Sequence, residues 1–340
     1  MRLSQSEKIE SVPVVSQLAV ELSSQAAGVL EQLGRTEDIR FSSDNNYVAI
    51  VGFLKNRFTL FALDIDKSAT VPKISVTKTI EVVSDHLKYP HGIDFLDART
   101  MAVANRHGTV SIFRLPENFA QLETGTVISL SPIRQIRRAN FRRALRMPGS
   151  VCVVESDGSR SEILVCDNHK GFVSHHVIDT ARRFSLPRNK MLLKAGLQIP
   201  DGITLSHDKH WIAVSNHVTH QIFIYDRNRQ LNPQSTPDGI CEGVQYPHGL
   251  RFSPDGQALF VADAGQPYVH RFIASGGAWS GTRSSDAQAR VMDEATFQDG
   301  RSNPQEGGPK GLDISADGKL LVVTSEHQSF GLFNLSEMFS

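Results

Sequence analysis

One short motif recurs six times along the chain and restricts the fold more than any other feature. Its clearest copies are Tyr89-Pro-His-Gly-Ile, Ile199-Pro-Asp-Gly-Ile and Tyr246-Pro-His-Gly-Leu, and Gly308-Pro-Lys-Gly-Leu is a fourth. Two weaker copies begin at Met147 and at Thr36, where the proline is missing. Copies spaced roughly 50 residues apart are typical of repeat architectures. The 340 residues are therefore expected to form one repeat array instead of two or three separate domains.

Each repeat has the same order of apolar runs and turns. In the copy that begins at Tyr246, the runs 250–252, 258–262 and 268–272 are separated by Ser253-Pro-Asp-Gly and by residues 263–267. Short runs rich in Val, Ile and Phe, bounded by Gly, Pro and Asp, predict strands. Fourth strands are expected at 73–80, 126–130 and 289–292. Four strands in each of six repeats predict an all-β fold, a six-bladed β-propeller.

The N-terminal part departs from this pattern. Apolar residues between Val14 and Leu33 recur mostly at spacings of three and four, which predicts an amphipathic helix packed against the repeats. We therefore divide the chain into an N-terminal extension with this helix, residues 1–34, and the propeller, residues 35–340. The last repeat has room for three strands only. A segment near residues 8–14 is expected to supply its outer strand and close the ring.

Composition narrows the class of partner. Lys+Arg and Asp+Glu both number 36, so no net charge draws the protein to nucleic acid or to an anionic membrane. The three cysteines are not spaced as metal ligands, and an odd number is not a disulfide framework. A reducing compartment is therefore favoured. With no signal-peptide pattern and no apolar run of membrane-spanning length, we expect a soluble, cytoplasmic protein. The sequence leaves its oligomeric state open.

A cluster of six arginines between Arg134 and Arg146 stands out in this balanced sequence. One interpretation is a contact with an anion or a nucleic acid. The other, which we favour, is a solvated insertion between blades that pairs with acidic loops.

Antiparallel order brings one residue of each repeat to the central axis. The residue before the motif glycine, called X below, begins the strand nearest the channel and so lies at its mouth. The six X residues form one ring: Glu37, His91, Gly149, Asp201, His248 and Lys310. All of them except Gly149 can ionise. A propeller needs only small or polar residues there, so the convergence of ionisable groups indicates a functional site.

The second strand of each repeat returns to the same face, so its end lies beside X. We interpret six polar residues at or just beyond these ends as candidate substrate contacts: Asn105, Asp167, Asn216, Asp263, His217 and Glu326. The alternative for the Asn and Asp residues is that they only cap the turns.

Carboxylates and imidazoles on one axis are suited to a divalent cation. We predict Glu37, Asp201, His91 and His248 as its ligands. Oxygen ligands favour calcium and histidines favour zinc, and the sequence leaves both open. Such a cation would polarise a carbonyl and lower the pKa of a bound water. Asp201, His248, His91 and Lys310 are the candidate catalytic residues, Lys310 either as an anion contact or as a nucleophile.

At these residues the chain resembles the six-bladed gluconolactonase/regucalcin and NHL-repeat propellers, over most of residues 35–336. Ile199-Pro-Asp-Gly-Ile looks like the Pro-Asp-Gly element of the gluconolactonase-like enzymes. The resemblance implies that Asp201 binds the channel metal and serves in catalysis, and that Glu37 is the first-blade ligand. The family's metal asparagine falls here on Gly149, which has no side-chain ligand. The two Pro-His-Gly elements are similar to those of peptidyl-hydroxyglycine lyase propellers, whose zinc-binding histidines lie on alternate blades, whereas His91 and His248 lie three blades apart.

Two functional hypotheses follow. The first is an enzyme that acts on a small molecule at the channel, with metal-assisted hydrolysis of a lactone or ester implied by the resemblance. Lyase or cyclase chemistry in a biosynthetic pathway would use the same groups. The second is a non-catalytic, NHL-like propeller that binds a protein or ligand through exposed apolar residues on one face. The low aromatic content, 7%, favours the enzyme.

Overall fold

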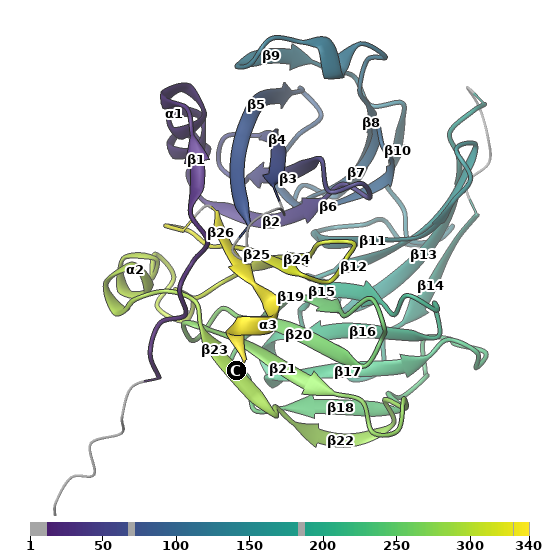
Figure 1. Ribbon diagram of the computed structural model, residues 1–340. Coiled ribbons are helices and arrows are strands. Elements are labelled where there is room, and N and C mark those ends of the chain that lie inside the picture. Colours follow the sequence, from purple (N-terminus) through teal and green to yellow (C-terminus); the bar gives the residue numbers. More distant parts are fainter. Residues whose placement is uncertain (1–11, 67–71, 183–187, 329, 340) are drawn as a thin grey trace, which may run out of the picture.

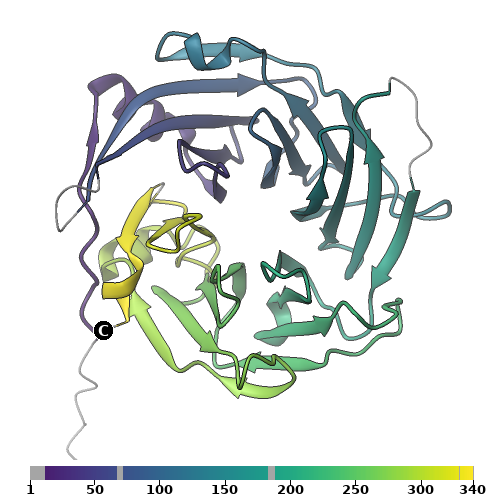
Figure 2. The same cartoon turned by 45° about the vertical axis from the view of Figure 1, so that its right-hand side comes forward.

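Six antiparallel sheets surround a central axis, so the predicted six-bladed β-propeller is confirmed (Figures 1 and 2). The computed structural model describes residues 12–66, 72–182, 188–328 and 330–339. In each sheet the first strand lies innermost and the following strands lie progressively further out. The motif thus opens the innermost strand of every blade.

The blades follow one another in sequence. Blade one contains β2 (Thr36–Phe41), β3 (Tyr47–Gly52), β4 (Arg57–Asp66) and β5 (Lys73–Val83), and blade two contains β6 (Pro90–Asp97), β7 (Thr100–Asn105), β8 (Thr109–Arg114) and β10 (Arg134–Ile136). Blade three contains β11 (Pro148–Ser156), β12 (Arg160–Asp167), β13 (Phe172–Asp179) and β14 (Arg188–Leu193), and blade four contains β15 (Pro200–Leu205), β16 (Trp211–Asn216), β17 (Gln221–Asp226) and β18 (Gly239–Glu242). Blade five contains β19 (Pro247–Phe252), β20 (Ala258–Asp263), β21 (Tyr268–Ile273) and β23 (Ala287–Arg290), and blade six contains β24 (Gly311–Ile314), β25 (Leu320–Thr324) and β26 (Gly331–Asn334).

Additional elements lie at the periphery. The parallel edge strands are β1 (Val20–Leu22) and β9 (Thr126–Ser129), which both pair with β5, and β22 (Gly281–Ser284), which pairs with β18. The helices are α1 (Ser24–Leu33), η1 (Phe119–Gln121), η2 (His217–Thr219), α2 (Glu294–Asp299) and α3 (Leu335–Met338). Within the described residues, no helix is both long and apolar enough to cross a membrane.

The core is divided into six apolar clusters, one between each pair of neighbouring blades. Each strand contributes alternate residues to the clusters on its two sides, because successive side chains of a strand point to opposite faces. Ala26, Val29 and Leu33 of α1 join the cluster between blades six and one. The N-terminal helix therefore packs against the propeller.

Three peripheral predictions need correction. The helix expected from Val14 begins only after its N-cap Ser23, which accepts a hydrogen bond from the backbone of Ala26, because residues 20–22 instead extend the open edge of β5. The strand expected at 126–130 lies on blade one, and β10 is the outer strand of blade two. The strand expected at 289–292 lies at Ala287–Arg290.

Within the described residues, no strand completes blade six, so the outer strand predicted for it is not found there, and residues just beyond the predicted segment join the last blades instead. Val15 donates a backbone hydrogen bond to Arg290 of blade five, and Leu18 donates one to Leu332 of blade six, each 2.8 Å long. Residues 14–18 thus bridge the last two blades beside β26. Most of the predicted segment, 8–11, lies outside the described residues.

The arginine-rich segment forms β10 and the loop that leads to blade three. Arg134 and Arg138 donate hydrogen bonds to the main-chain carbonyls of Asp179 and Phe141. Phe141 at the loop tip is 92% exposed, and Arg146 reaches the mouth of the channel. We expected these arginines to pair with acidic loops, but Arg134 and Arg138 contact main-chain carbonyls instead.

Candidate active site

In five of the six blades, a β-bulge at X bends the inner strand toward the axis. In blades one to five, the pairing register of the first two strands shifts across X, for example between Pro90 and Gly92 and between Pro200 and Ile203. A bulge inserts an extra residue, bends the strand and changes the direction of a side chain. The motif therefore places a side chain in the channel from each of these blades except blade three, where X is Gly149.

The glycine after X is required by the neighbouring blade. A Cβ atom on Gly202 would lie 2.0 Å from the carbonyl oxygen of His248, and one on Gly249 would lie 2.6 Å from that of Lys310. Gly92 makes the same approach to Gly149, at 2.7 Å. Inner strands thus contact one another through backbone, which brings their X side chains close together.

The ionisable X residues meet on the axis, and all five are at most 5% exposed. The Nε2 atoms of His91 and His248 lie 3.4 and 3.6 Å from Oε2 of Glu37, and Lys310 Nζ lies 3.5 Å from the same oxygen. His248 Nε2 is also 3.4 Å from Oδ2 of Asp201. The sixfold arrangement therefore collects these residues, as the repeats predict.

Glu37, His91 and His248 form a buried cluster that could hold a metal ion. One ligand atom from each lies within 4.8 Å of the others. Oε2 of Glu37 is buried without a hydrogen-bond partner. Nδ1 of His91 lies 2.7 Å from the carbonyl oxygen of Gly149 and must be its protonated nitrogen, so the lone pair of Nε2 faces the axis.

Blade three contributes an amide from a position that the motif does not mark. Asn168 lies in the turn after β12, and its Nδ2 donates a 2.5 Å hydrogen bond to Oδ1 of Asp201. A Cβ atom on Gly149 would lie only 2.0 Å from Oδ1 of Asn168. The missing side chain at Gly149 thus makes room for Asn168, whose Oδ1 is buried and unpartnered.

Four of the predicted substrate contacts are locked into the scaffold. Asn105, Asp167, Asn216 and Asp263 are fully buried, and none of them lines a described cavity. Their side-chain oxygens accept backbone N–H groups three residues before X, from Lys88, Arg146, Gln198 and Gln245 respectively, at 2.5–3.0 Å. This placement fits the capping alternative and leaves no surface for a substrate.

The residue one step further along the chain reaches the site instead. Arg106 Nη2 lies 2.6 Å from Nε2 of His91 and 3.3 Å from Oδ1 of Asp201. His217 Nε2 lies 3.1 Å from Oε1 of Glu306, and Glu326 accepts a 3.1 Å hydrogen bond from Lys310. His217 and Glu326 were predicted as site residues.

Sequence reasoning missed Arg35, Arg106 and Glu306. Arg35 pairs with Glu37 and with Glu326, and Glu306 lies 3.2 Å from Lys310. The signal for Arg106 was its place directly after a strand-end Asn, the same place that His217 has in blade four. Glu306 comes from the loop after α2 and has no counterpart in the repeat.

Burial and opposite charges set the protonation states. Burial disfavours the ionised form of Glu37, but the positive charges of Lys310 and Arg35 outweigh it and hold the pKa of Glu37 below its usual value. The pKa of Asp201 is likewise low, because His248 and Arg106 overcome its burial. Burial, followed by the charge of Arg106, lowers the pKa of His91 to about 3. Near neutral pH the two carboxylates are therefore ionised and His91 is neutral.

A second pair carries charge at the rim. His217 is buried, which disfavours its protonated form, but its hydrogen bond to Glu306 and the charge of Asp201 raise its pKa. The pKa of Glu306 falls to about 2, since His217 and Lys310 outweigh its burial. Lys310 also has a raised pKa, because Glu37 and Glu306 overcome the cost of burying it. Lys310 thus stays protonated.

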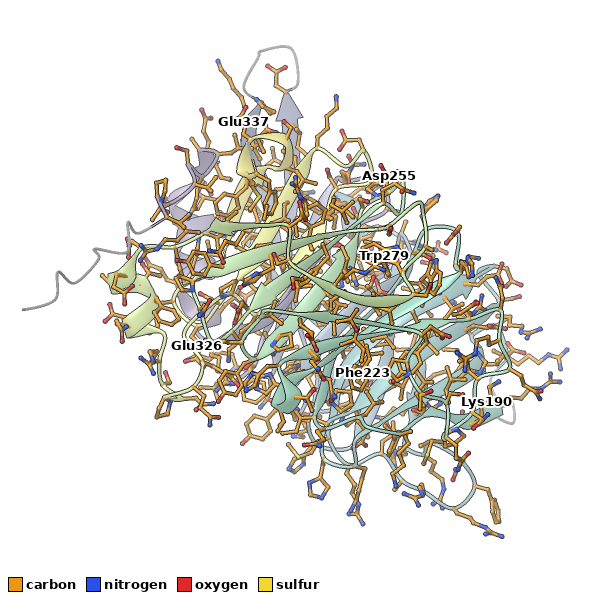
Figure 3. All side chains as sticks on the ribbon, turned by 90° about the horizontal axis from the view of Figure 1, so that it is seen from below. Lys190, Phe223, Asp255, Trp279, Glu326 and Glu337 are labelled. Atoms are coloured by element: carbon orange, nitrogen blue, oxygen red, sulfur yellow. The ribbon has the colours of Figure 1, made fainter. Side chains whose placement is uncertain are left out.

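A cavity of about 1100 Å³ opens above the ring. Asp201, Arg106, Asn168, His217 and Glu306 line it together with apolar side chains of the channel mouth. A space of about 10 Å³, enough for one water molecule, lies deeper between Glu37, His91 and His248. Among the described residues, only Asp201 lines both the large cavity and the small axial space. Figure 3 shows Glu326, beside Lys310 at this end of the blades, well away from Asp255 in the turn between β19 and β20.

No protein-family model and no curated protein sequence matches the chain. Solved structures do match. One, provisionally described as a 6-phosphogluconolactonase of Bacteroides uniformis ATCC 8492, has a TM-score of 0.55 and 15% sequence identity over 87% of this chain and 80% of that chain. At this identity the likeness is one of fold, and it agrees with what the repeats and the sheets indicate: the chain is a β-propeller.

Proposed function

We propose that the protein is a hydrolase that opens a small lactone or ester at the mouth of the channel, with a divalent cation bound by the axial cluster. One observation carries this proposal. Asp201, a buried carboxylate that is ionised near neutral pH, borders the large cavity on one side and the axial space on the other. A carboxylate so placed can reach a substrate and a metal-bound water at once.

The residues on the axis fit a divalent cation. Glu37 offers a buried oxygen that accepts no hydrogen bond, and His91 and His248 offer imidazole nitrogens within 4.8 Å of it. Two imidazoles with a carboxylate favour zinc or another transition metal over calcium, which prefers oxygen ligands throughout. Asp201 and Asn168 complete the surroundings. When bound, such a cation would polarise the substrate carbonyl and lower the pKa of a coordinated water.

The proposed roles of the protein groups follow from their charges. Asp201 is the general base, because its low pKa keeps it ionised and its two oxygens are held by Asn168, Arg106 and His248. His217 is the general acid, because its pair with Glu306 keeps a proton on the imidazole beside the cavity. Their environments shift the two pKa values in opposite directions, as acid and base roles require.

In the proposed step, water attacks the carbonyl carbon while Asp201 accepts its proton. The bond between the carbonyl carbon and the ring or ester oxygen then breaks, and His217 donates its proton to that leaving oxygen. A lactone gives a hydroxy acid, and an ester gives an acid and an alcohol. Lys310 keeps its proton and balances Glu37 and Glu306, so we assign it an electrostatic role instead of a nucleophilic one.

The second candidate is a propeller that binds a ligand without chemistry. It is favoured by a specific observation: Tyr89, Ile199 and Val218 at the cavity mouth are large apolar residues that are 39–43% exposed. The binding hypothesis requires exposed apolar residues of this kind on one face. Turnover distinguishes the two candidates, since both predict ligand binding at the same mouth.

The decisive experiment combines metal analysis with two conservative variants. We expect about one equivalent of a transition metal in the purified protein, and hydrolysis of lactones or aryl esters that stops when a chelator removes the metal. Asp201→Asn and His217→Gln should each lower kcat/KM by roughly 10²–10⁴-fold, the usual contribution of a general acid or base. Asp208→Asn and His207→Gln, in the turn at the other end of blade four, are the matched controls.

Two results would overturn the proposal. Full activity of Asp201→Asn would remove the base, and hydrolysis that is absent in a metal-loaded protein over the whole substrate panel would favour the binding candidate.

A further inference from the structure

The residue before the motif proline forms an apolar collar around the cavity mouth. Tyr89, Met147, Ile199 and Tyr246 occupy this position in blades two to five, and all four line the cavity. Tyr89, Met147 and Ile199 are 42%, 38% and 39% exposed. Three of these large apolar side chains are thus exposed, and Tyr246 is half-buried, at one equivalent place in successive repeats.

The backbone does not explain these side chains. Tyr89, Ile199 and Tyr246 have φ angles of 53°, 53° and 50°, in the left-handed region that glycine and asparagine adopt more easily than other residues. What the fold uses at these positions is the main-chain carbonyl. It accepts the N–H of Arg106, His217 and Ala264 respectively, at 3.0–3.2 Å. Glycine or asparagine would supply the same carbonyl with less strain, so a structural role does not require Tyr or Ile.

Aromatic contacts hold the collar in place. The ring of Tyr89 lies 5.4 Å from that of Phe53 and 5.9 Å from that of His107. The ring of Tyr246 lies 4.5 Å from His220 in an edge-to-face arrangement and 5.1 Å from His217. Rings fixed in this way lose little freedom when a ligand packs against them. The two tyrosines are therefore preformed parts of the collar.

The cavity is lined by charged groups and by apolar ones. Asp201 at its inner end borders the axial space, with Arg106 beside it, and Tyr89, Met147 and Ile199 of the collar are exposed at its mouth. Its volume of about 1100 Å³ is at the upper end for small-molecule pockets and much larger than a bare lactone ring needs. A molecule that fits both ends has a polar reacting group and a long apolar part.

We propose that the collar binds the apolar part of the substrate, an alkyl chain or an aromatic ring, so that the site selects a hydrophobic lactone or ester over a sugar lactone. The reacting group in this inference rests on the proposed function, whereas binding by the collar does not. Each methylene that the collar removes from water should tighten binding about fourfold until the cavity is filled.

The test uses γ-lactones from butyrolactone to dodecanolactone, with glucono-δ-lactone as the polar comparison. Binding is measured by calorimetry in the Asp201→Asn background, where turnover does not interfere. Ile199→Asn and Tyr246→Asn keep the left-handed backbone but replace the apolar side chain, and Ile273→Asn is the control, because Ile273 is 44% exposed at the outer part of blade five. Thermal melting verifies that every variant is folded.

We expect affinity to rise with chain length in the parent. The double collar variant should bind dodecanolactone at least about tenfold more weakly, while its affinity for butyrolactone and its melting temperature stay unchanged. Affinity that is independent of chain length, or tighter binding of glucono-δ-lactone, would overturn the collar inference even if Asp201→Asn abolishes hydrolysis. Collar-dependent binding without hydrolysis in the parent would instead overturn the proposed function.

Discussion

At the scale of single residues, the centre of the channel already contains balancing charges. Four carboxylates, Glu37, Asp201, Glu306 and Glu326, meet Lys310, Arg35, Arg106 and His217. Arg106 has the most consequential position, since its guanidinium lies 2.6 Å from the nitrogen that His91 would offer to a metal. A cation that enters the axial cluster must therefore compete with Arg106 for His91 and Asp201.

Arg106→Gln is expected to tighten metal binding. Removal of the guanidinium frees Nε2 of His91 and takes away a positive charge beside the incoming cation. Changes next to metal ligands alter affinity by roughly 10–100-fold, and we expect an increase within this range. Titration of the metal-free protein with Zn²⁺ against a competing chelator measures it. Arg146→Gln is the control, because Arg146 lines the same cavity without contacting His91 or Asp201.

The opposite outcome is equally informative. Weaker metal binding in Arg106→Gln would mean that Arg106 holds Asp201 in a geometry that the cation needs, and competition would be excluded.

At the scale of elements, the inner strands determine how tightly the site is assembled. The motif glycines let neighbouring inner strands approach through backbone, and the bulges of blades one to five bend the inner strands at X. The steric limit is most severe at Gly202, where a Cβ atom would meet a carbonyl oxygen, Leu250 Cδ2 and Ser215 Oγ at 2.0, 2.6 and 3.0 Å.

Gly202→Ala should destabilise the protein by about 1–3 kcal/mol, the usual cost of an added methyl group in a closely packed core, and near the upper limit because the nearest obstacle is backbone. Gly28→Ala in α1 is the matched control. No atom lies within 4 Å of its added Cβ, and alanine favours a helix by about 0.5–1 kcal/mol. In urea unfolding, the midpoint of Gly202→Ala should be lower than that of the parent, and the midpoint of Gly28→Ala should be higher. An unchanged midpoint for Gly202→Ala would contradict the close approach of β15 and β19.

The strands also differ in how well the sequence predicts them. Inner strands could be predicted because their signals are local: a proline, an X residue, a glycine and an apolar run. Outer strands have open edges, so their partners depend on which edge is near, and residues 126–129 pair with β5 of the preceding blade. Along the second strands, one step changes the face that a side chain points to, so Asn105 is locked into the scaffold while Arg106 reaches the axis.

At the scale of the whole molecule, the ring depends on a contact between the ends of the chain. Blade six has three strands in the described residues, and its edge strand β26 meets the N-terminal segment 14–18 beside the first blade (Figure 2). Val15 packs into the cluster between blades five and six, and Leu18 packs into the cluster between blades six and one. The segment therefore joins the clusters on both sides of the last blade.

Simultaneous replacement of Val15 and Leu18 by alanine should destabilise the propeller by about 2 kcal/mol, since each partly buried aliphatic side chain contributes about 1–1.5 kcal/mol of burial. The loss should appear first in blade six, as faster amide exchange in Gly331–Asn334, because that strand loses its neighbour. Gln17→Ala, an exposed position between the two, is the control. Unaltered exchange in β26 together with an unchanged unfolding midpoint would show that the six blades hold together without the N-terminal segment. The ring of X residues would then depend on the inner strands alone.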